Sequence, residues 1–497
     1  MFVKKLFFLL LLGFVLHNAS AQHFDPPLRL EFDISQSKYP VNVELLGENG
    51  LVFFFQKDAK EDLRWTISHY DTNFQLTNTK SIPFDARVSV SATGSNNNFF
   101  YAVLQSNASA KANATNTYIL LYDIAMKKID IFSFYHTDRE KIRSISYFGD
   151  IFVFSTYNSK SEGHLYLFNN KEMNIKTFHK EIPYSCDFQD AYWDTVSHSL
   201  WIVTKFSESK KQTFIYLTQL NANGDILQDI SIKSDNKYNL HSCRIVSANS
   251  GDMLLFGSYL QNEGSNFLTK NNNSGIFTAI ITNNIVEQLV FFEYSMLDNW
   301  YSMHKKNLSN CFDISYFIAQ NDSFFIIVSD FYSPEYQQQF YADRYASGIG
   351  FYPATAAETK LIGFKYQTAC LLTFNKQGKL LWYNQLNYSG LLLKSVRPLL
   401  SGYIDSETNN TLYLFEYGNK IFSIVYDTTE IVQPIKTIPL LSSSRFENIN
   451  SNEKSYCRHW YGSNFVCYAY QKTSKKYGSN SRNNSKSVFG VNKLVYN

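Results

Sequence analysis

The chain has 497 residues, and its 46 Lys and Arg against 43 Asp and Glu give a net charge of +3, so there is no electrostatic case for nucleic-acid binding. It is rich in Phe (42) and Tyr (35), while 21 Gly and 10 Pro are too few for a collagen-like or disordered chain. Because aromatic and β-branched residues favour strands and period-two alternation dominates, the composition predicts an all-β protein.

Residues 1–21 have the form of a signal peptide. Lys4 and Lys5 precede an apolar stretch at residues 6–16, and Ala19-Ser20-Ala21 fits a cleavage site. No cysteine follows that would take a lipid anchor, and no later stretch reaches the roughly 18 apolar residues of a transmembrane helix. We therefore expect an exported chain that begins at Gln22 and has no transmembrane segment.

The first elements of the expected mature chain are strands. Residues 28–34 alternate apolar and polar side chains but have no adjacent hairpin partner. A hairpin follows at residues 43–55, with its turn at Glu48-Asn49-Gly50, and Asn-Gly between alternating apolar residues is a strong hairpin signal. Similar pairs of strands are expected at 142–155, 191–203, 244–257 and 313–328.

A second hairpin pattern returns about seven times along the chain: an alternating strand, a polar turn and another strand. Adjacent turns are separated by 47 to 60 residues, except for one interval of 93 residues, and they are centred on Asp71, Asp123, Asn170, Asn223, Asn283, Lys376 and Asp427. A four-stranded blade takes about 40–50 residues. The spacing therefore predicts a β-propeller with one large insertion.

The two ends of the chain complement each other in this interpretation. Residues 456–471 form a further expected hairpin and residues 487–496 a third strand, so the last blade lacks a fourth strand. The orphan strand at residues 28–34 can supply it and so remove the exposed edges of an open sheet. We predict one propeller domain over residues 22–497, with eight four-stranded blades closed by the N-terminal strand; seven blades is the alternative.

The six cysteines suggest at most one recognisable pair. An exported protein can form disulfides, and Cys457 and Cys467 flank a turn at residues 461–464, so they could face each other across a hairpin. The alternative is that all six are small buried residues. No C-x-x-C pair is present, and we predict no metal site. The six positions are Cys186, Cys243, Cys311, Cys370, Cys457 and Cys467.

The long interval carries an aromatic insertion at residues 333–360. Its stretch 337–345 could form a short helix. Long insertions on a rigid scaffold often carry function, and Tyr and Arg are enriched in protein interfaces. The alternative is a lid folded onto its own blade. The predicted partner-binding residues are Tyr336, Phe340, Tyr341, Arg344, Tyr345, Phe351 and Tyr352.

Recognisable catalytic motifs are missing from the sequence. It contains no H-E-x-x-H, no G-x-S-x-G and no phosphate-binding G-x-x-x-x-G-K-[ST], so we predict no cofactor and lean against an enzyme. The remaining enzymatic possibility is a pair of carboxylates acting as acid and base on a glycan. Asp194 is expected to be a turn residue, and the candidates are Asp187, Asp190, Asp194, Asp313 and Asp330.

The repeated turn resembles that of a known group of proteins. Leu220-Asn-Ala-Asn-Gly-Asp-Ile226, Phe374-Asn-Lys-Gln-Gly-Lys-Leu380 and the signal end Ala19-Ser-Ala-Gln22 resemble secreted β-propellers of the Bacteroidota type. The resemblance implies an exported protein in the periplasm or at the outer membrane, or alternatively outside the cell. It also implies a non-catalytic accessory subunit that binds a protein partner, plug-like in a secretion or uptake complex. The alternative function is a glycan-binding or glycan-cleaving propeller.

Overall fold

The computed structural model describes residues 28–34, 41–56, 64–84, 88–106, 115–136, 141–157, 164–178, 185–209, 212–221, 223–234, 237–249, 252–261, 275–297, 312–342, 355–417, 420–439, 447–475 and 486–496. The predicted signal peptide lies outside these ranges. Within them the chain is nearly all strand, which confirms the all-β prediction, with two 3-10 helices, η1 (Gly47–Asn49) and η2 (Tyr294–Met296). No helix in the described ranges is long and apolar enough to cross a membrane.

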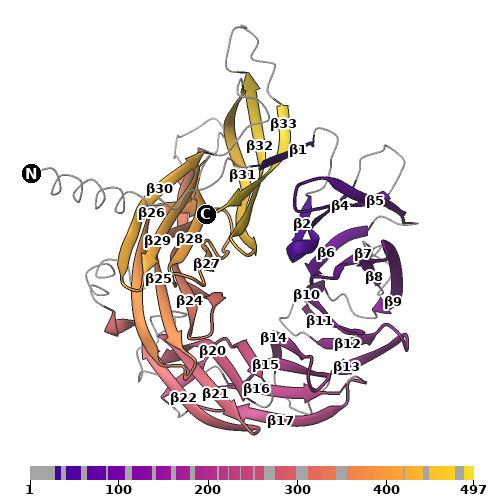
Figure 1. Cartoon of the computed structure of the whole chain (residues 1–497), viewed down its shortest axis with the longest axis vertical. Helices are drawn as coiled ribbons and strands as arrows, with labels where there is room; N and C mark the ends of the chain where they lie inside the picture. Colours follow the sequence, from indigo (N-terminus) through magenta and orange to yellow (C-terminus); the bar gives the residue numbers. More distant parts are fainter. Residues whose placement is uncertain are drawn as a thin grey trace, which may run out of the picture. The chain divides into compact units, whose positions relative to one another are not determined.

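The chain forms two compact units. The described residues of the smaller unit fall within Met1–Gln36, Glu416–Phe422 and Thr437–Asn497, and those of the larger unit fall within Ser37–Phe415 and Ser423–Lys436. Strands β2 to β30 fall almost wholly in the larger unit, where they form seven sheets that follow one another in chain order (Figure 1).

Each of these sheets is built from strands consecutive in sequence. In the fifth sheet, β18 and β19 both pair with β20 and together fill the first position. The sheets are β2 (Asn42–Leu45), β3 (Leu51–Gln56), β4 (Arg64–Tyr70) and β5 (Leu76–Pro83); β6 (Val88–Ser95), β7 (Phe99–Ser106), β8 (Thr115–Asp123) and β9 (Lys128–His136); β10 (Lys141–Phe148), β11 (Ile151–Tyr157), β12 (Leu165–Asn169) and β13 (Asn174–Phe178); β14 (Ser185–Asp194), β15 (Ser199–Ser209), β16 (Gln212–Leu220) and β17 (Ile226–Ile232); β18 (Tyr238–Leu240), β19 (Arg244–Asn249), β20 (Asp252–Gln261), β21 (Gly275–Thr282) and β22 (Ile285–Glu293); β23 (Phe312–Gln320), β24 (Phe324–Ala342), β25 (Thr355–Asn375) and β26 (Leu380–Leu393); and β27 (Ser401–Ile404), β28 (Thr411–Tyr417), β29 (Lys420–Asp427) and β30 (Glu430–Pro439).

The repeated turn joins the third and fourth strands of each sheet, where the sequence placed it. In three sheets the turn has the same hydrogen bonds: the side-chain oxygen of Asp71, Asn221 or Asn375 accepts the backbone N–H groups two and four residues later, at 2.8–3.1 Å. The residue three positions on has a positive φ, of 79° at Gly224 and 69° at Gly378. Asx side chains and glycine favour this geometry, which explains the recurring Asn-x-x-Gly pattern.

The same turns also connect successive sheets. Lys176 Nζ on β13 donates to Asn223 O in the next sheet at 2.7 Å, and Thr278 Oγ1 on β21 donates to Gly378 O at 2.7 Å. A Cβ atom added to Gly378 would lie 2.6 Å from Thr278 Oγ1. The glycine is therefore required for both the positive φ and the close approach of the neighbouring sheet.

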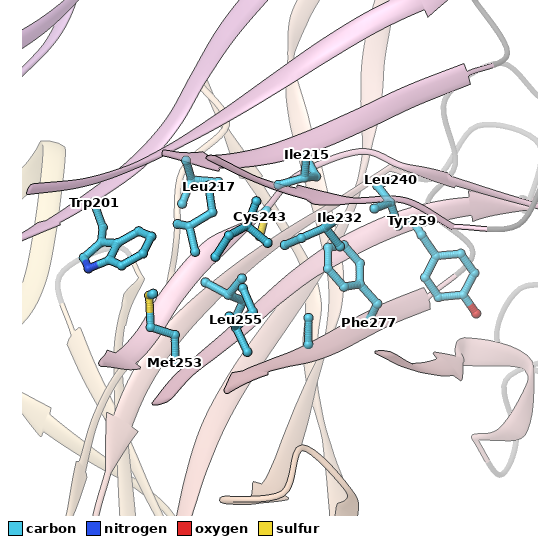
Figure 2. Close-up of a cluster of buried hydrophobic side chains, with 14 residues drawn as sticks. Trp201, Ile215, Leu217, Ile232, Leu240, Cys243, Met253, Leu255, Tyr259 and Phe277 are labelled. Atoms are coloured by element: carbon cyan, nitrogen blue, oxygen red, sulfur yellow. The ribbon is translucent and has the colours of Figure 1, made fainter. Parts of the chain in front are cut away.

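Apolar clusters fill the spaces between adjacent sheets of the larger unit. Figure 2 shows the cluster between the β14–β17 and β18–β22 sheets, to which Trp201 and Leu217 contribute from one side and Met253, Leu255 and Phe277 from the other. Equivalent clusters lie at four other junctions between successive sheets, from β2–β5 to β23–β26. Full burial of one such side chain stabilises the fold by about 1.5–3 kcal/mol, and this packing accounts for much of the aromatic content.

The smaller unit contains a sheet made from both ends of the chain, with the order β1 (Leu28–Asp33), β33 (Lys486–Val495), β32 (Asn464–Lys475) and β31 (Glu447–Tyr461). β1 is antiparallel to β33 over its full length. The N-terminal strand thus completes the last sheet, as predicted, and the described residues form eight sheets rather than seven.

A nearly buried ion pair within β1 makes polar contacts with β32 and β33. Arg29 Nη2 lies 2.9 Å from Glu31 Oε2 and donates to Gln471 Oε1 at 2.8 Å, and Lys486 Nζ lies 3.2 Å from Glu31 Oε1. Burial alone would raise the pKa of Glu31, but the hydrogen bonds and charges of Arg29 and Lys486 lower it. A Cβ atom on Gly490 would lie 2.4 Å from Gln471 Oε1 and 2.8 Å from the Arg29 guanidinium, so only glycine leaves room for this group.

Cys457 and Cys467 lie directly opposite each other on β31 and β32 and are joined by a disulfide, with their Cα atoms 4.1 Å apart. Cys243 and Cys370 are buried and free of disulfides. Burial raises the pKa of both thiols, which lowers their reactivity. Cys311 lies outside the described residues.

Candidate functional site

Two strands of the sixth sheet are much longer than their neighbours. β24 has 19 residues and β25 has 21. β23 pairs with β24 only as far as Tyr332, and β26 pairs with β25 only as far as Phe364. Residues 335–342 and 355–363 continue beyond these points as a two-stranded ribbon, which we call the ribbon. At about 3.3 Å per residue it reaches roughly 25 Å past the four-stranded part of the sheet.

The ribbon forms much of the predicted aromatic insertion. The expectation of a helix at 337–345 is wrong for residues 337–342, which belong to β24 and pair with residues 355–360 of β25. Phe340 and Tyr341 lie on β24 within the ribbon. Four of the predicted partner-binding residues lie outside the described residues: Arg344, Tyr345, Phe351 and Tyr352.

Large apolar side chains are exposed where the ribbon begins. Tyr336 is 55% exposed, and Leu361 directly opposite it on β25 is 45% exposed. Ile362 and Leu392, the latter near the end of β26, are also exposed. Exposed apolar groups that cluster in this way are typical of interaction surfaces, whereas single ones need no explanation.

A buried carboxylate fixes the base of the ribbon. Asp330 on β24 is fully buried; its Oδ1 accepts a hydrogen bond from Tyr388 OH at 2.6 Å, and its Oδ2 accepts from Tyr316 OH at 2.7 Å and from Leu399 N at 3.0 Å. Tyr316 OH in turn accepts from Leu400 N at 2.9 Å. Burial raises the pKa of Asp330 to about 6, although the three donors act in the opposite direction. One carboxylate thus joins β23, β24, β26 and the segment leading to β27.

A second contact reinforces the same segment. Tyr366 OH on β25 donates to Arg397 O at 2.8 Å and accepts from Arg397 N at 2.8 Å. The register of β25 and β26 shifts beside it, between Tyr366 and Thr368, and Gly390 on β26 has a φ of 80°. Bulges of this kind re-aim side chains. Strands β23, β24 and β25 are therefore each joined to residues 397–400 by hydrogen bonds.

Asp313 also belongs to a hydrogen-bond network that joins neighbouring elements of the fold. Its Oδ2 accepts from Tyr294 OH at 2.9 Å and from Ser315 Oγ at 3.0 Å, and Tyr294 OH lies 2.9 Å from Ser329 Oγ. Tyr294 is buried, and burial raises the pKa of its hydroxyl. This network ties η2 to β23 and β24.

The other three candidate carboxylates lie on β14. Asp190 Oδ2 accepts from Ile245 N of the next sheet at 3.0 Å, and burial raises its pKa against the charge of a nearby arginine. Asp187 accepts from a glutamine two residues later at 2.9 Å. Asp194 accepts from Val196 N at 2.9 Å, in the turn role predicted for it. Each of the five candidates has its own local partners, so their arrangement does not favour an acid–base pair.

Within the described ranges, no three His, Cys, Asp or Glu side chains are grouped as a metal site would require. What sequence reasoning missed is the pair of tyrosines that bind Asp330. Tyr316 and Tyr388 are 14 and 58 residues away from it, and nothing local distinguishes them from other strand tyrosines. The glycine two residues after Tyr388 was the one available signal, because a glycine inside a strand often marks a bulge.

No protein-family model matches the chain, and no curated protein matches it in sequence. Its strand order is that of a β-propeller, because consecutive four-stranded antiparallel sheets in chain order define that class.

Solved structures similar to the chain include propeller proteins. The Pyrococcus horikoshii acylaminoacyl peptidase is 9% identical, with a TM-score of 0.35, over 79% of this chain and 53% of that one. The β-propeller domain of the trilobed protease from Pyrococcus furiosus is 10% identical, with a TM-score of 0.34, over 79% and 99%. The WD40 domain of SCAP from fission yeast is 8% identical, with a TM-score of 0.31, over 81% and 95%. The chain thus spans about half the length of the acylaminoacyl peptidase.

Proposed function

We propose that this protein is a non-catalytic binding subunit, an eight-bladed propeller closed by β1 that presents the ribbon to a protein partner. The observation that carries the proposal is the length of β24 and β25, which continue past both neighbouring strands and expose Tyr336 and Leu361 at the start of the extension. Packing a four-stranded sheet does not require this extension. Tyrosine on a protruding element supplies a large contact area with little loss of rotamer freedom.

The anchoring of the ribbon supports the same proposal. Asp330 and Tyr366 connect its base to residues 397–400 through buried hydrogen bonds. An element that is ordered before binding loses less conformational entropy when the partner arrives, so more of the contact energy appears as affinity. The fixed position of the ribbon therefore supports a role in binding a protein partner rather than an insertion without function.

The cellular setting is also part of the proposal. The signal-peptide features of residues 1–21 suggest export, and we place the protein in the periplasm or at the outer membrane, as an accessory or plug-like subunit of a secretion or uptake complex. The balanced charge, +3 over the chain, gives no reason to prefer a nucleic acid as the partner.

The test is a comparison of two tyrosine variants in affinity purification from native membranes, followed by mass spectrometry. Tyr336→Ser removes the exposed tyrosine of the ribbon, and Tyr417→Ser is the matched control because Tyr417 is 51% exposed on β28, outside the ribbon. We expect the co-purifying membrane partner to be lost with Tyr336→Ser, or with replacement of residues 336–361 by a two-residue turn, and retained with Tyr417→Ser. Retention of the same partner after the replacement would disprove the proposal.

A further inference from the structure

The free edge of β25 is a second surface of the ribbon. On one side, residues 355–363 pair with β24. On the other side, β26 ends at Leu393, opposite Phe364, and no strand among the described residues continues along this edge. The backbone N–H and C=O groups of an open edge can pair with an added strand.

The sequence of this edge is complementary to itself. Two antiparallel copies centred on Thr359 place Glu358 of each copy opposite Lys360 of the other. The same register places an alanine opposite each of Leu361 and Ile362. Opposite charges directly across a strand pair are favourable, and small residues opposite large ones allow close packing.

Neighbouring registers lack this match. A centre on Glu358 sets two carboxylates opposite each other, and a centre on Lys360 sets two ammonium groups opposite each other, which is destabilising. A centre between Thr359 and either neighbour leaves every charge opposite an uncharged residue. Charge therefore selects one register among those close to it.

Thr359 lies within the open part of this edge. Among the described residues, the ribbon part of β25 extends from residue 355 to residue 363, and β26 occupies the edge from Phe364 onward. The register that matches the charges therefore pairs positions of β25 that β26 leaves open.

We propose that two copies of the chain associate by antiparallel pairing of their β25 edges about Thr359. The interface is isologous and closes after two copies, because both copies use the same edge. The inference rests on the proposed function, in which the ribbon is the interaction element, and names a second copy as the partner of this edge. Tyr336 lies on β24 and not on the paired edge, so it stays available to a different protein.

The test is a charge-swap series on the mature chain, residues 22–497, by sedimentation velocity over a range of micromolar concentrations. We expect the wild type to dimerise. Glu358→Lys alone and Lys360→Glu alone should each weaken the dimer by about tenfold or more, because two attractive pairs become two repulsive ones. The double variant Glu358→Lys/Lys360→Glu should restore it, and an equimolar mixture of the two single variants should form a heterodimer.

A monomeric wild type, single variants that dimerise as strongly as the wild type, or a mixture that stays monomeric would each overturn the inference. Restoration in the double variant and in the mixture excludes misfolding as the cause of a loss in the single variants. The partner experiment with Tyr336→Ser separates this inference from the proposed function. A monomeric chain that still loses its partner through Tyr336→Ser contradicts the dimer alone, and a dimer with unchanged partners contradicts the proposed function alone.

Discussion

Replacing Asp330 by alanine should destabilise the larger unit severely. The change leaves the hydroxyls of Tyr316 and Tyr388 and the N–H of Leu399 without their acceptor in a fully buried site. A buried donor left unsatisfied costs about 1–3 kcal/mol. The N–H of Leu399 keeps a longer hydrogen bond to Tyr316 OH at 3.3 Å, so we count mainly the two hydroxyl donors and expect a loss of about 2–6 kcal/mol.

Asparagine is the matched control for this change. Asp330→Asn keeps an acceptor oxygen for Leu399 N and Tyr316, and the hydroxyl of Tyr388 can rotate to accept from the new amide. It also removes a buried charge at neutral pH. The O–H of Tyr388 then loses its acceptor, so we expect a loss of about 1–3 kcal/mol, smaller than that of the alanine variant.

The assay is urea unfolding at pH 7.5, followed by near-ultraviolet circular dichroism, with amide exchange as a local measure. The N–H of Leu399 should exchange much faster in Asp330→Ala than in the wild type, because local opening there no longer breaks its bond to Asp330. The N–H of Leu400 should follow, because its acceptor Tyr316 OH is no longer held by Asp330. If alanine and asparagine variants lose the same stability, or if Leu399 keeps its protection in the alanine variant, the reasoning from buried donors is refuted.

Three further outcomes are expected. Burial raises the pKa of Asp330 from 3.8 to about 6, so the protonated carboxyl contributes its full stability below pH 4 and this contribution is lost as the pH rises through 6. Between pH 4 and pH 8, urea unfolding should show the wild type losing about 2 kcal/mol relative to Asp330→Asn. Glu31 should behave in the opposite way because, despite burial, Arg29 lowers its pKa. Its contribution to stability is therefore present above pH 4.5 and is lost in acid. In Glu31→Gln, the protection of the β1 amides from exchange should no longer decrease as the pH is lowered. Gly378→Ala should cost about 2–4 kcal/mol, because the position has a φ of 69° and an added Cβ would lie 2.6 Å from a threonine Oγ1. Gly462→Ala is the control: its φ is 48° and the nearest atom to an added Cβ is 4.0 Å away, so the cost should be only about 1 kcal/mol. Equal losses of stability in thermal or urea unfolding would contradict this prediction.

Local signals made the strand order predictable. Turns such as Asn221-x-x-Gly224 combine an Asx acceptor with a residue that tolerates positive φ, so they stand out in the sequence without knowledge of distant contacts. The pairing of β1 with β33 was predictable for a different reason. An alternating strand without a partner at one end of the chain matched an incomplete sheet at the other.

The parts that could not be predicted depend on long-range contacts. Residues 337–342 include a run of glutamines that is compatible with a helix, but pairing with residues 355–360 decides in favour of a strand. The tyrosines that bind Asp330 lie on two other strands, and Tyr388 lies where the register of β25 and β26 shifts beside Tyr366. A buried hydrogen-bond network of this kind is a property of the folded sheet rather than of any segment.

The pairing of β1 with β33 has a consequence for folding kinetics. The two strands lie at opposite ends of the sequence, so their contact has nearly the largest chain separation available. Contacts of high sequence separation form slowly because loop closure is entropically costly, and this one cannot form until the C-terminal strand has been synthesised. We therefore expect the sheet of the smaller unit to be the last to form, with the edge of β33 exposed until β1 arrives. β1 is synthesised first, so this strand must wait for the rest of the protein.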